Sequence, residues 1–285
     1  MAIATTRHSL QCAEVWSGHG AIENQASSRG LEAWVLSHPF HDQADGGDVH
    51  YFSLCLGGLV TRIVLADVAG HGSVVAATSL RLKRLLRRFM NTKRQVQLVS
   101  EINRAFISGE AEGRFVTAVV MTYLHHRRRL LVTNAGHPRP LFYSRSLGSW
   151  SLIESPSSNA GSENSDAVDM PFGIDDSADY SELAQPIADG DLVVLYTDAL
   201  TEVTGDDDRL LGESGLLALV RRIDVRADCA SIGHELRGLV RDYGGGESND
   251  DESLIVIKFG EGRRTPRVVE RLRGYWSTLC GTIRG

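Results

Sequence analysis

The pattern of hydrophobic residues changes period along the chain and so predicts where strands give way to helices. Short runs rich in valine, isoleucine and leucine, bounded by turn residues, are typical of strands. Such runs cover residues 31–37, 49–56, 59–66, 115–124, 130–133, 141–143, 191–197 and 253–259. Apolar residues spaced three and four apart predict amphipathic helices at residues 73–90, 95–107, 213–223 and 229–243.

The order of these segments predicts an α+β fold, because strands and helices occur in separate groups rather than alternating as in a parallel sheet. One domain, residues 31–260, accounts for the whole pattern. Residues 1–30 are polar and lack a clear period, so we expect an irregular lead-in. Residues 155–169 contain almost no apolar side chains and predict a mobile loop. The basic segment 261–285 ends in an amphipathic pattern and is predicted to be a helical tail.

Composition narrows the class of protein. With 42% hydrophobic and 23% charged residues among 285, the chain is typical of a globular protein that buries a large core. The net charge of −6 argues against nucleic acid or an anionic membrane as a partner. The four cysteines form no paired motif, and no apolar segment is long enough for a signal peptide or a membrane span. We therefore expect a reduced, cytoplasmic protein.

Four aspartates stand beside predicted buried strands. They are Asp48 after a pair of glycines, Asp67 at the end of an apolar run, Asp198 after a second run, and Asp250 before the last. A single aspartate at a strand end is more often a turn former or a helix cap than a ligand. Four in similar turns favour a shared role, and their hard oxygen ligands suit Mg²⁺ or Mn²⁺ rather than zinc. We predict that they converge around two such cations, which could clamp a phosphoryl group and activate a water.

Seven short segments carry a resemblance to a known family and occur in that family's order. They are residues 46–48, 66–72, 115–118, 134–138, 171–174, 190–202 and 250–257. In these segments the chain resembles the PPM-type metal-dependent serine/threonine phosphatases, in the branch typified by stage II sporulation protein E and the sigma-factor regulatory phosphatases. The resemblance implies a four-layer αββα sandwich of two antiparallel β-sheets flanked by helices, with a dinuclear Mn²⁺ or Mg²⁺ site at one edge.

The resemblance also implies a role for individual residues. Asp67 matches the aspartate that bridges both metals, and Val68 matches a ligand that acts through its backbone carbonyl. Asp48 would hold one metal, while Asp198 and Asp250 would hold the other. His71 is a candidate acid beside Asp67, since its ordinary pKa lies near neutrality, although shaping the turn into the helix is its alternative role.

Three positions depart from the family pattern. Ala199 stands where glycine is usual, Glu252 where an apolar residue is common, and Arg139 where proline is common. None of these departures removes an expected metal ligand, so the sequence predicts an active enzyme. A second acidic group, 206–208, is interpreted as an exposed turn rather than an extra cation site.

The predicted activity is hydrolysis of phosphoserine or phosphothreonine on a regulatory protein by a metal-activated water. The resemblance suggests a phosphorylated anti-sigma-factor antagonist as substrate. Two other phosphatase chemistries lack their residues, because Arg62 lies one position too far from Cys55 for a cysteine phosphatase and Leu200 replaces the second aspartate of a dehalogenase-like enzyme. A non-catalytic phosphoprotein-binding regulator on the same fold and a small-metabolite phosphohydrolase remain alternatives. The oligomeric state is open.

Overall fold

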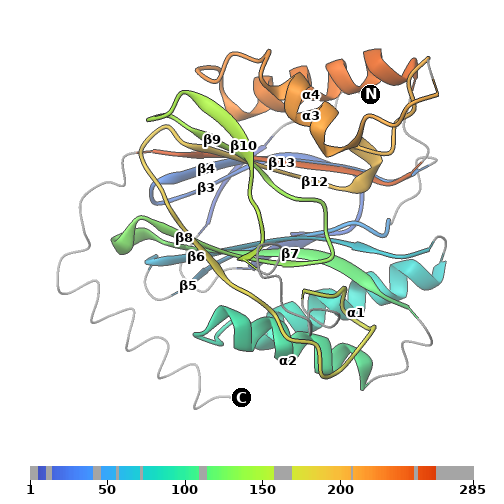
Figure 1. The fold of residues 1–285 in the computed structure, drawn as a ribbon. Coiled ribbons are helices and arrows are strands. Elements are labelled where there is room, and N and C mark those ends of the chain that lie inside the picture. The colour runs from blue at the N-terminus through green and yellow to red at the C-terminus, as the bar shows by residue number, and fades with distance from the viewer. Residues whose placement is uncertain are drawn as a thin grey trace.

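The computed structural model describes residues 6–10, 15–40, 46–55, 58–70, 73–108, 114–156, 169–206, 208–246 and 250–260. These residues form two β-sheets that stack face to face between two pairs of helices (Figure 1). The predicted α+β sandwich of four layers is therefore confirmed.

The first sheet has seven strands, and its order places the last strand of the chain near its centre. In spatial order its strands are β1 (Thr6–Ser9), β3 (Ile22–Ser28), β4 (Leu31–His38), β13 (Glu252–Phe259), β12 (Leu192–Tyr196), β9 (Leu141–Ser144) and β10 (Ser149–Leu152). Neighbouring strands are antiparallel except for β1 and β3, which pair in parallel and so depart from the expected all-antiparallel sheet.

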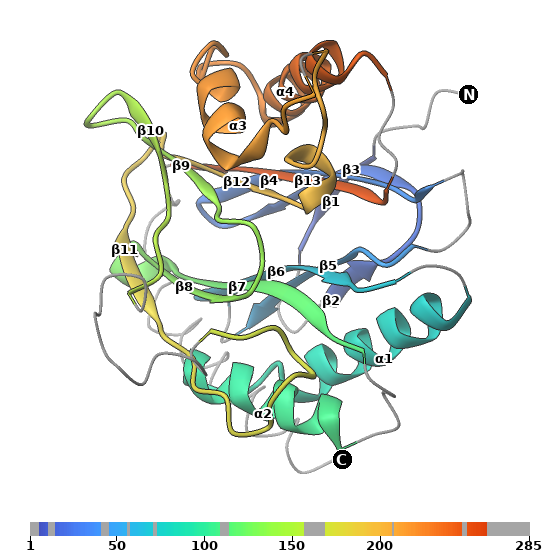
Figure 2. The ribbon, with the colours of Figure 1, turned by 45° about the vertical axis from the view of Figure 1, so that its right-hand side comes forward.

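The second sheet has six antiparallel strands. In spatial order they are β11 (Leu183–Pro186), β8 (Arg129–Ala135), β7 (Val116–Leu124), β6 (Val60–Val68), β5 (Val49–Cys55) and β2 (Val15–Gly18). Helices α1 (Ser73–Phe89) and α2 (Gln95–Ile107) cover its outer face, and α3 (Gly212–Val220) and α4 (Cys229–Gly244) cover the outer face of the first sheet (Figure 2).

Strand β6 shows why its apolar run is continuous rather than alternating. Successive side chains of a strand point to opposite faces of the sheet. Ile63 and Leu65 pack in the core between the two sheets, whereas Val64 and Ala66 pack against the helices α1 and α2. Both faces of this strand are therefore buried over residues 63–66. The polar residues Thr61 and Arg62 lie near its start, and Asp67 lies near its other end.

The prediction of an irregular segment over residues 1–30 is wrong, because β1, β2 and β3 lie within it. β1 and β2 are the outermost strands of their sheets, and β3 is polar and partly exposed, so these strands lack the apolar pattern of a buried strand. Two more strands that the pattern did not predict, β10 and β11, are also outermost strands. The predicted loop over residues 155–169 and the predicted tail over 261–285 lie largely or wholly outside the described residues.

Among the described residues, no helix combines the length and the apolar character needed to cross a membrane.

Candidate metal centre

The strand pairing brings the predicted aspartates to one edge of the sandwich. Val49 at the start of β5 lies opposite Ala66 on β6, so Asp48 neighbours the end of β6 that carries Asp67. In the other sheet, Tyr196 at the end of β12 lies opposite Leu254 on β13. Asp198 and Asp250 therefore flank the same edge of that sheet, one after β12 and one before β13.

Hydrogen bonds join the two sheets at this edge. The hydroxyl of Thr197, which follows β12, donates to Oδ2 of Asp48 in the other sheet at 3.2 Å. The same hydroxyl oxygen accepts from the backbone N–H of Ser253 at 3.0 Å. Asp48, Thr197 and Ser253 are all buried, so the carboxylate of Asp48 is held in one orientation.

Asp251 fixes the turn that carries Asp48. Its carboxylate accepts from the backbone N–H of Phe40 at 2.7 Å and from the backbone N–H of Gly47. A Cβ on Gly46 would lie 2.9 Å from Oδ2 of Asp251, and a Cβ on Gly47 would lie 3.1 Å from the carbonyl oxygen of Val68. The two glycines thus allow this turn to approach both the Asp251 carboxylate and the Val68 carbonyl.

The carboxylates at this edge influence one another strongly. Burial, followed by the negative charges of Asp198 and Asp250, raises the pKa of Asp67 to about 7. Burial also raises the pKa of Asp48 well above its ordinary value, with the charge of Asp67 as the next cause. For Asp198 the pKa is raised by burial and then by the charge of Glu202. The charges therefore lie close together, and none of these causes is a neighbouring cation.

A hard divalent cation fits this set of donors. The Oδ1 atom of Asp48 is buried without a hydrogen-bond partner among the described residues, which is costly unless a cation or another donor meets it. Around it stand carboxylate oxygens, the ligand type that Mg²⁺ and Mn²⁺ prefer. Within the described ranges, no three acidic, histidine or cysteine side chains already lie close enough together to enclose an ion. The donor chemistry fits a metal, while the final coordination geometry stays a prediction.

The structure thus brings Asp48, Asp67, Asp198 and Asp250 together, and the Val68 carbonyl faces the glycine turn. His71 lies outside the described residues, so its proposed role as an acid stays a prediction. Sequence reasoning did not give Asp251 and Glu202 roles at this edge. Both belonged to segments that carry the family resemblance, and their proximity to Asp67 depends on the packing of the two sheets.

A buried turn supports the strand next to Asp67. Oδ1 of Asn134 accepts from the backbone N–H of His137 at 2.7 Å, and its amide nitrogen donates to the His137 carbonyl at 2.7 Å. Nδ1 of His137 lies 2.9 Å from the hydroxyl oxygen of Thr117, and Thr117 is directly opposite Asp67 in the β6–β7 register. Burial lowers the pKa of His137 to about 3, so this imidazole is neutral. Its place here is structural.

The three departures from the family pattern have local explanations. Arg139 donates through its backbone N–H and its Nε to the two oxygens of Glu213, and its Nη1 donates to Glu154. Glu252 accepts from Nε and Nη2 of Arg237 at 2.7 and 2.8 Å. Ala199 lies in the short 3₁₀ helix η5 (Asp198–Leu200) and is not among the residues with positive φ. A glycine is therefore not required there.

A curated protein shares sequence with part of this chain. Over 142 residues the chain is 24% identical to phosphoserine phosphatase RsbU of Bacillus subtilis (strain 168), covering 50% of this chain and 39% of that protein. The chain thus spans less than half the length of this curated relative.

Solved structures share the fold. The RsbU and RsbW domains of Rv1364c from Mycobacterium tuberculosis superpose with a TM-score of 0.69 at 20% identity, over 93% of this chain and 72% of that one. RsbX in complex with magnesium superposes with a TM-score of 0.59 at 15% identity, over 84% of this chain and all of that one (100%). The sandwich of two sheets is therefore a fold that this chain shares with both solved structures.

The family follows from the sequence match. The family model described as Stage II sporulation protein E (SpoIIE) matches residues 58–260, and the chain belongs to that family. The matched segment contains Asp67, Asp198 and Asp250, whereas Asp48 precedes it.

Proposed function

We propose that this protein is a metal-dependent serine/threonine protein phosphatase. The observation that carries the proposal is the group of carboxylates at the shared edge of the two sheets, where burial and mutual repulsion raise the pKa values of Asp48, Asp67 and Asp198. Folding tolerates such repulsion most readily where a cation completes the site. Membership of the SpoIIE family and the partial match to a phosphoserine phosphatase support the same activity.

Named residues would hold the cations. Asp67 would bridge two Mn²⁺ or Mg²⁺ ions, with Asp48 and the Val68 carbonyl holding one ion and Asp198 and Asp250 holding the other. The solved RsbX structure contains magnesium, which supports a divalent ion here as well. When bound, such ions polarise a phosphoryl oxygen and lower the pKa of a water.

The remaining residues would position these ligands. Thr197 and Ser253 orient the Asp48 carboxylate, and Asp251 fixes the backbone of the turn before it. The pair of His137 and Thr117 supports the strand opposite Asp67. His71 would act as an acid toward the departing group if its side chain reaches this edge. None of these contacts requires a nucleophilic side chain, which is consistent with attack by water.

A phosphorylated regulatory protein is the substrate that we propose, and an anti-sigma-factor antagonist is the specific candidate. The relatives support this choice, since one is a phosphoserine phosphatase and another joins RsbU and RsbW domains in one chain. A cytoplasmic location stays a prediction from the sequence.

The decisive experiment measures phosphate release from a phosphoserine-containing protein by the full chain with EDTA, Mg²⁺ or Mn²⁺. We expect turnover only with a divalent ion. Asp67→Asn should lower kcat/KM by at least about 100-fold, because the bridging charge is lost. The matched control is Asp206→Asn, which changes an exposed aspartate of the same type and should leave the rate within about twofold.

Two other outcomes would replace this proposal. A folded protein that binds Mn²⁺ and a phosphoprotein but releases no phosphate would be a non-catalytic regulator. Faster hydrolysis of small phosphorylated metabolites than of phosphoproteins would make the chain a metabolite phosphohydrolase. Both comparisons use the same preparation, so misfolding cannot imitate either result.

A further inference from the structure

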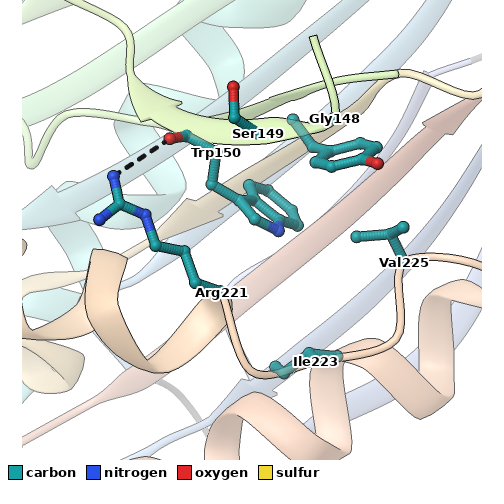
Figure 3. Close-up of a pocket in the computed structure, with 7 residues that line it drawn as sticks. Gly148, Ser149, Trp150, Arg221, Ile223 and Val225 are labelled. Atoms are coloured by element: carbon teal, nitrogen blue, oxygen red, sulfur yellow. Dashed lines mark hydrogen bonds between the residues drawn. The ribbon is translucent and has the colours of Figure 1, made fainter. Parts of the chain in front are cut away.

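A second site lies on the helix side of the first sheet, away from the carboxylates. It is a cavity of about 330 Å³ between the β9–β10 hairpin and the connection from α3 to α4 (Figure 3). Tyr143 on β9 lines it and lies opposite Leu192, at the start of β12. Asp198 is six residues further along the chain, so at about 3.3 Å per residue the two sites are roughly 20 Å apart.

Two aromatic rings form one wall of this cavity. The rings of Tyr143 and Trp150 have centroids 5.3 Å apart and planes inclined at 51°. Ile223 and Val225, from the connection after α3, lie across from the indole ring (Figure 3). The space between them is therefore apolar on two sides, and its volume lies near the lower end of the range for small-molecule sites, which is about 300 Å³.

The indole N–H of Trp150 meets no acceptor in the part of the chain that the structure describes. Trp150 is 5% exposed, and its Nε1 atom is buried without a hydrogen-bond partner among the described residues. Figure 3 shows this nitrogen on the edge of the indole that faces the turn carrying Ile223 and Val225. An indole nitrogen can only donate a hydrogen bond, and burying it without a partner costs stability. A ligand that brings an acceptor to this nitrogen would therefore stabilise the site.

A positive charge stands beside the indole. Arg221 donates to the carbonyl oxygen of Trp150 at 3.4 Å, and in the described part of the chain no carboxylate forms an ion pair with it. The nearest acidic residue in sequence, Asp224, instead contacts Arg226 at 3.7 Å. The charge on the lining of the cavity is thus that of one guanidinium with donors to spare.

We propose that this cavity binds a small carboxylate carried on a flat apolar body. The carboxylate would accept from the Trp150 indole N–H and from the Arg221 guanidinium, and the flat body would lie between the aromatic rings and Ile223. An anion without the apolar body would lose the ring contacts, and an uncharged amide would lose the charge-assisted bond. The site is separate from the carboxylate edge, so its existence does not depend on phosphatase activity.

Nitrogen-15 NMR of the full chain tests this inference directly. The four tryptophans give four indole N–H signals, and Trp150→Phe identifies the signal of Trp150. Titration with phenylacetate should move that signal saturably, whereas acetate and phenylacetamide should bind at least about tenfold more weakly. Arg221→Gln should weaken phenylacetate binding about tenfold, and Arg222→Gln, an exposed neighbour that does not line the cavity, should leave it unchanged.

Three results would overturn the proposal. The first is a Trp150 signal that does not respond to phenylacetate in protein whose spectrum shows a folded chain. The second is equal binding of phenylacetate and phenylacetamide, which would remove the role of the charge. The third is an unchanged affinity in Arg221→Gln, which would place the bound molecule elsewhere.

Discussion

The carboxylates at the two ends of strand β12 differ in whether the protein supplies them with hydrogen-bond donors or cations. At its start, Asp191 is 3% exposed and accepts from the backbone N–H groups of Arg145 and Ala188, at 2.8 and 2.7 Å. The neighbouring Asp189 pairs with Arg128. Past its other end, Asp198 shares an edge with Asp67, and the causes acting on these two carboxyl groups include further negative charges but no cation.

This difference separates structural carboxylates from those available to a ligand. A buried carboxylate stabilises a fold when the protein supplies its donors, as for Asp191. Carboxylates that lie close together without a positive partner destabilise the metal-free fold. A cation that binds them relieves this repulsion and stabilises the fold.

Adding a divalent ion should have the largest effect. In metal-free protein the pKa of Asp67 is raised from 3.8 to about 7, so between these values the folded state binds more protons than the unfolded state. Metal-free stability should therefore fall as pH rises from about 4 to about 7. At pH 7.5, Mn²⁺ at about 1,000 times its Kd should add about 4 kcal/mol to the free energy of unfolding.

Urea unfolding at pH 5 and pH 7.5, with EDTA or with Mn²⁺, measures both effects. Asp67→Asn is the control, since it removes one of the three carboxylates with a raised pKa and should make the metal-free pH dependence less steep. If metal-free stability rises between pH 5 and pH 7.5 and Mn²⁺ has no effect, the carboxylates at the acidic edge do not form a cation site.

The second largest change in stability is expected when the ion pair between Arg237 and Glu252 is broken. Arg237→Leu leaves Glu252, which is 7% exposed, without its two charge-assisted hydrogen bonds. We expect a loss of about 3 kcal/mol in the free energy of unfolding, measured by urea denaturation. The double variant with Glu252→Val should recover most of that loss, because an apolar pair replaces the ion pair. Failure of the second change to restore stability would show that Arg237 acts through other contacts.

At the opposite end of β12, Asp191→Asn should destabilise the fold by about 2 kcal/mol. The new amide group would face one of two backbone N–H donors that now point at carboxylate oxygens. Turnover per folded molecule should stay the same, in contrast to Asp67→Asn. Thermal unfolding and phosphate release measured on one preparation separate the two properties. A large loss of turnover at full stability would assign Asp191 to the reaction instead.

The smallest effect is expected for Ala199→Gly, which restores the residue usual in the family. Ala199 does not have a positive φ, so glycine gains nothing there and adds freedom to the unfolded chain. Stability should fall by about 0.5–1 kcal/mol with turnover unchanged, as measured by thermal unfolding and phosphate release. An increase in turnover would show that the alanine restrains the Asp198 turn.

The sequence was sufficient for the inner strands and the helices because burial imposes a strong pattern there. Strand β12 is apolar throughout, β6 is apolar over residues 63–66, and helix α2 was predicted with its observed bounds. Four of the five strands that were missed are the outermost strands of their sheets, where one edge faces no neighbour and polar residues are tolerated. The fifth, β3, lies next to such a strand, and six of its seven residues are partly exposed.

The same limit applies to the sites. Asp48, Asp67, Asp198 and Asp250 stand out locally because each adjoins an apolar strand, whereas the clamp formed by Asp251 depends on a contact across 204 positions in the sequence. Trp150 had no distinguishing neighbours in sequence. Its unpaired N–H becomes visible only after α3 and the β9–β10 hairpin have packed together.

The position of β13 has a consequence for how the protein is made. This strand is the last in the described chain, yet it lies between β4 and β12, and its first residues border the acidic edge. The ribosome must therefore have synthesised residue 259 before this sheet can form completely. Until then, Asp48 and Asp67 in the second sheet lack the β13 side of the acidic edge. The acidic edge is therefore incomplete until β13 has joined the sheet, so a nascent fragment that stops short of β13 lacks the strand next to Asp250.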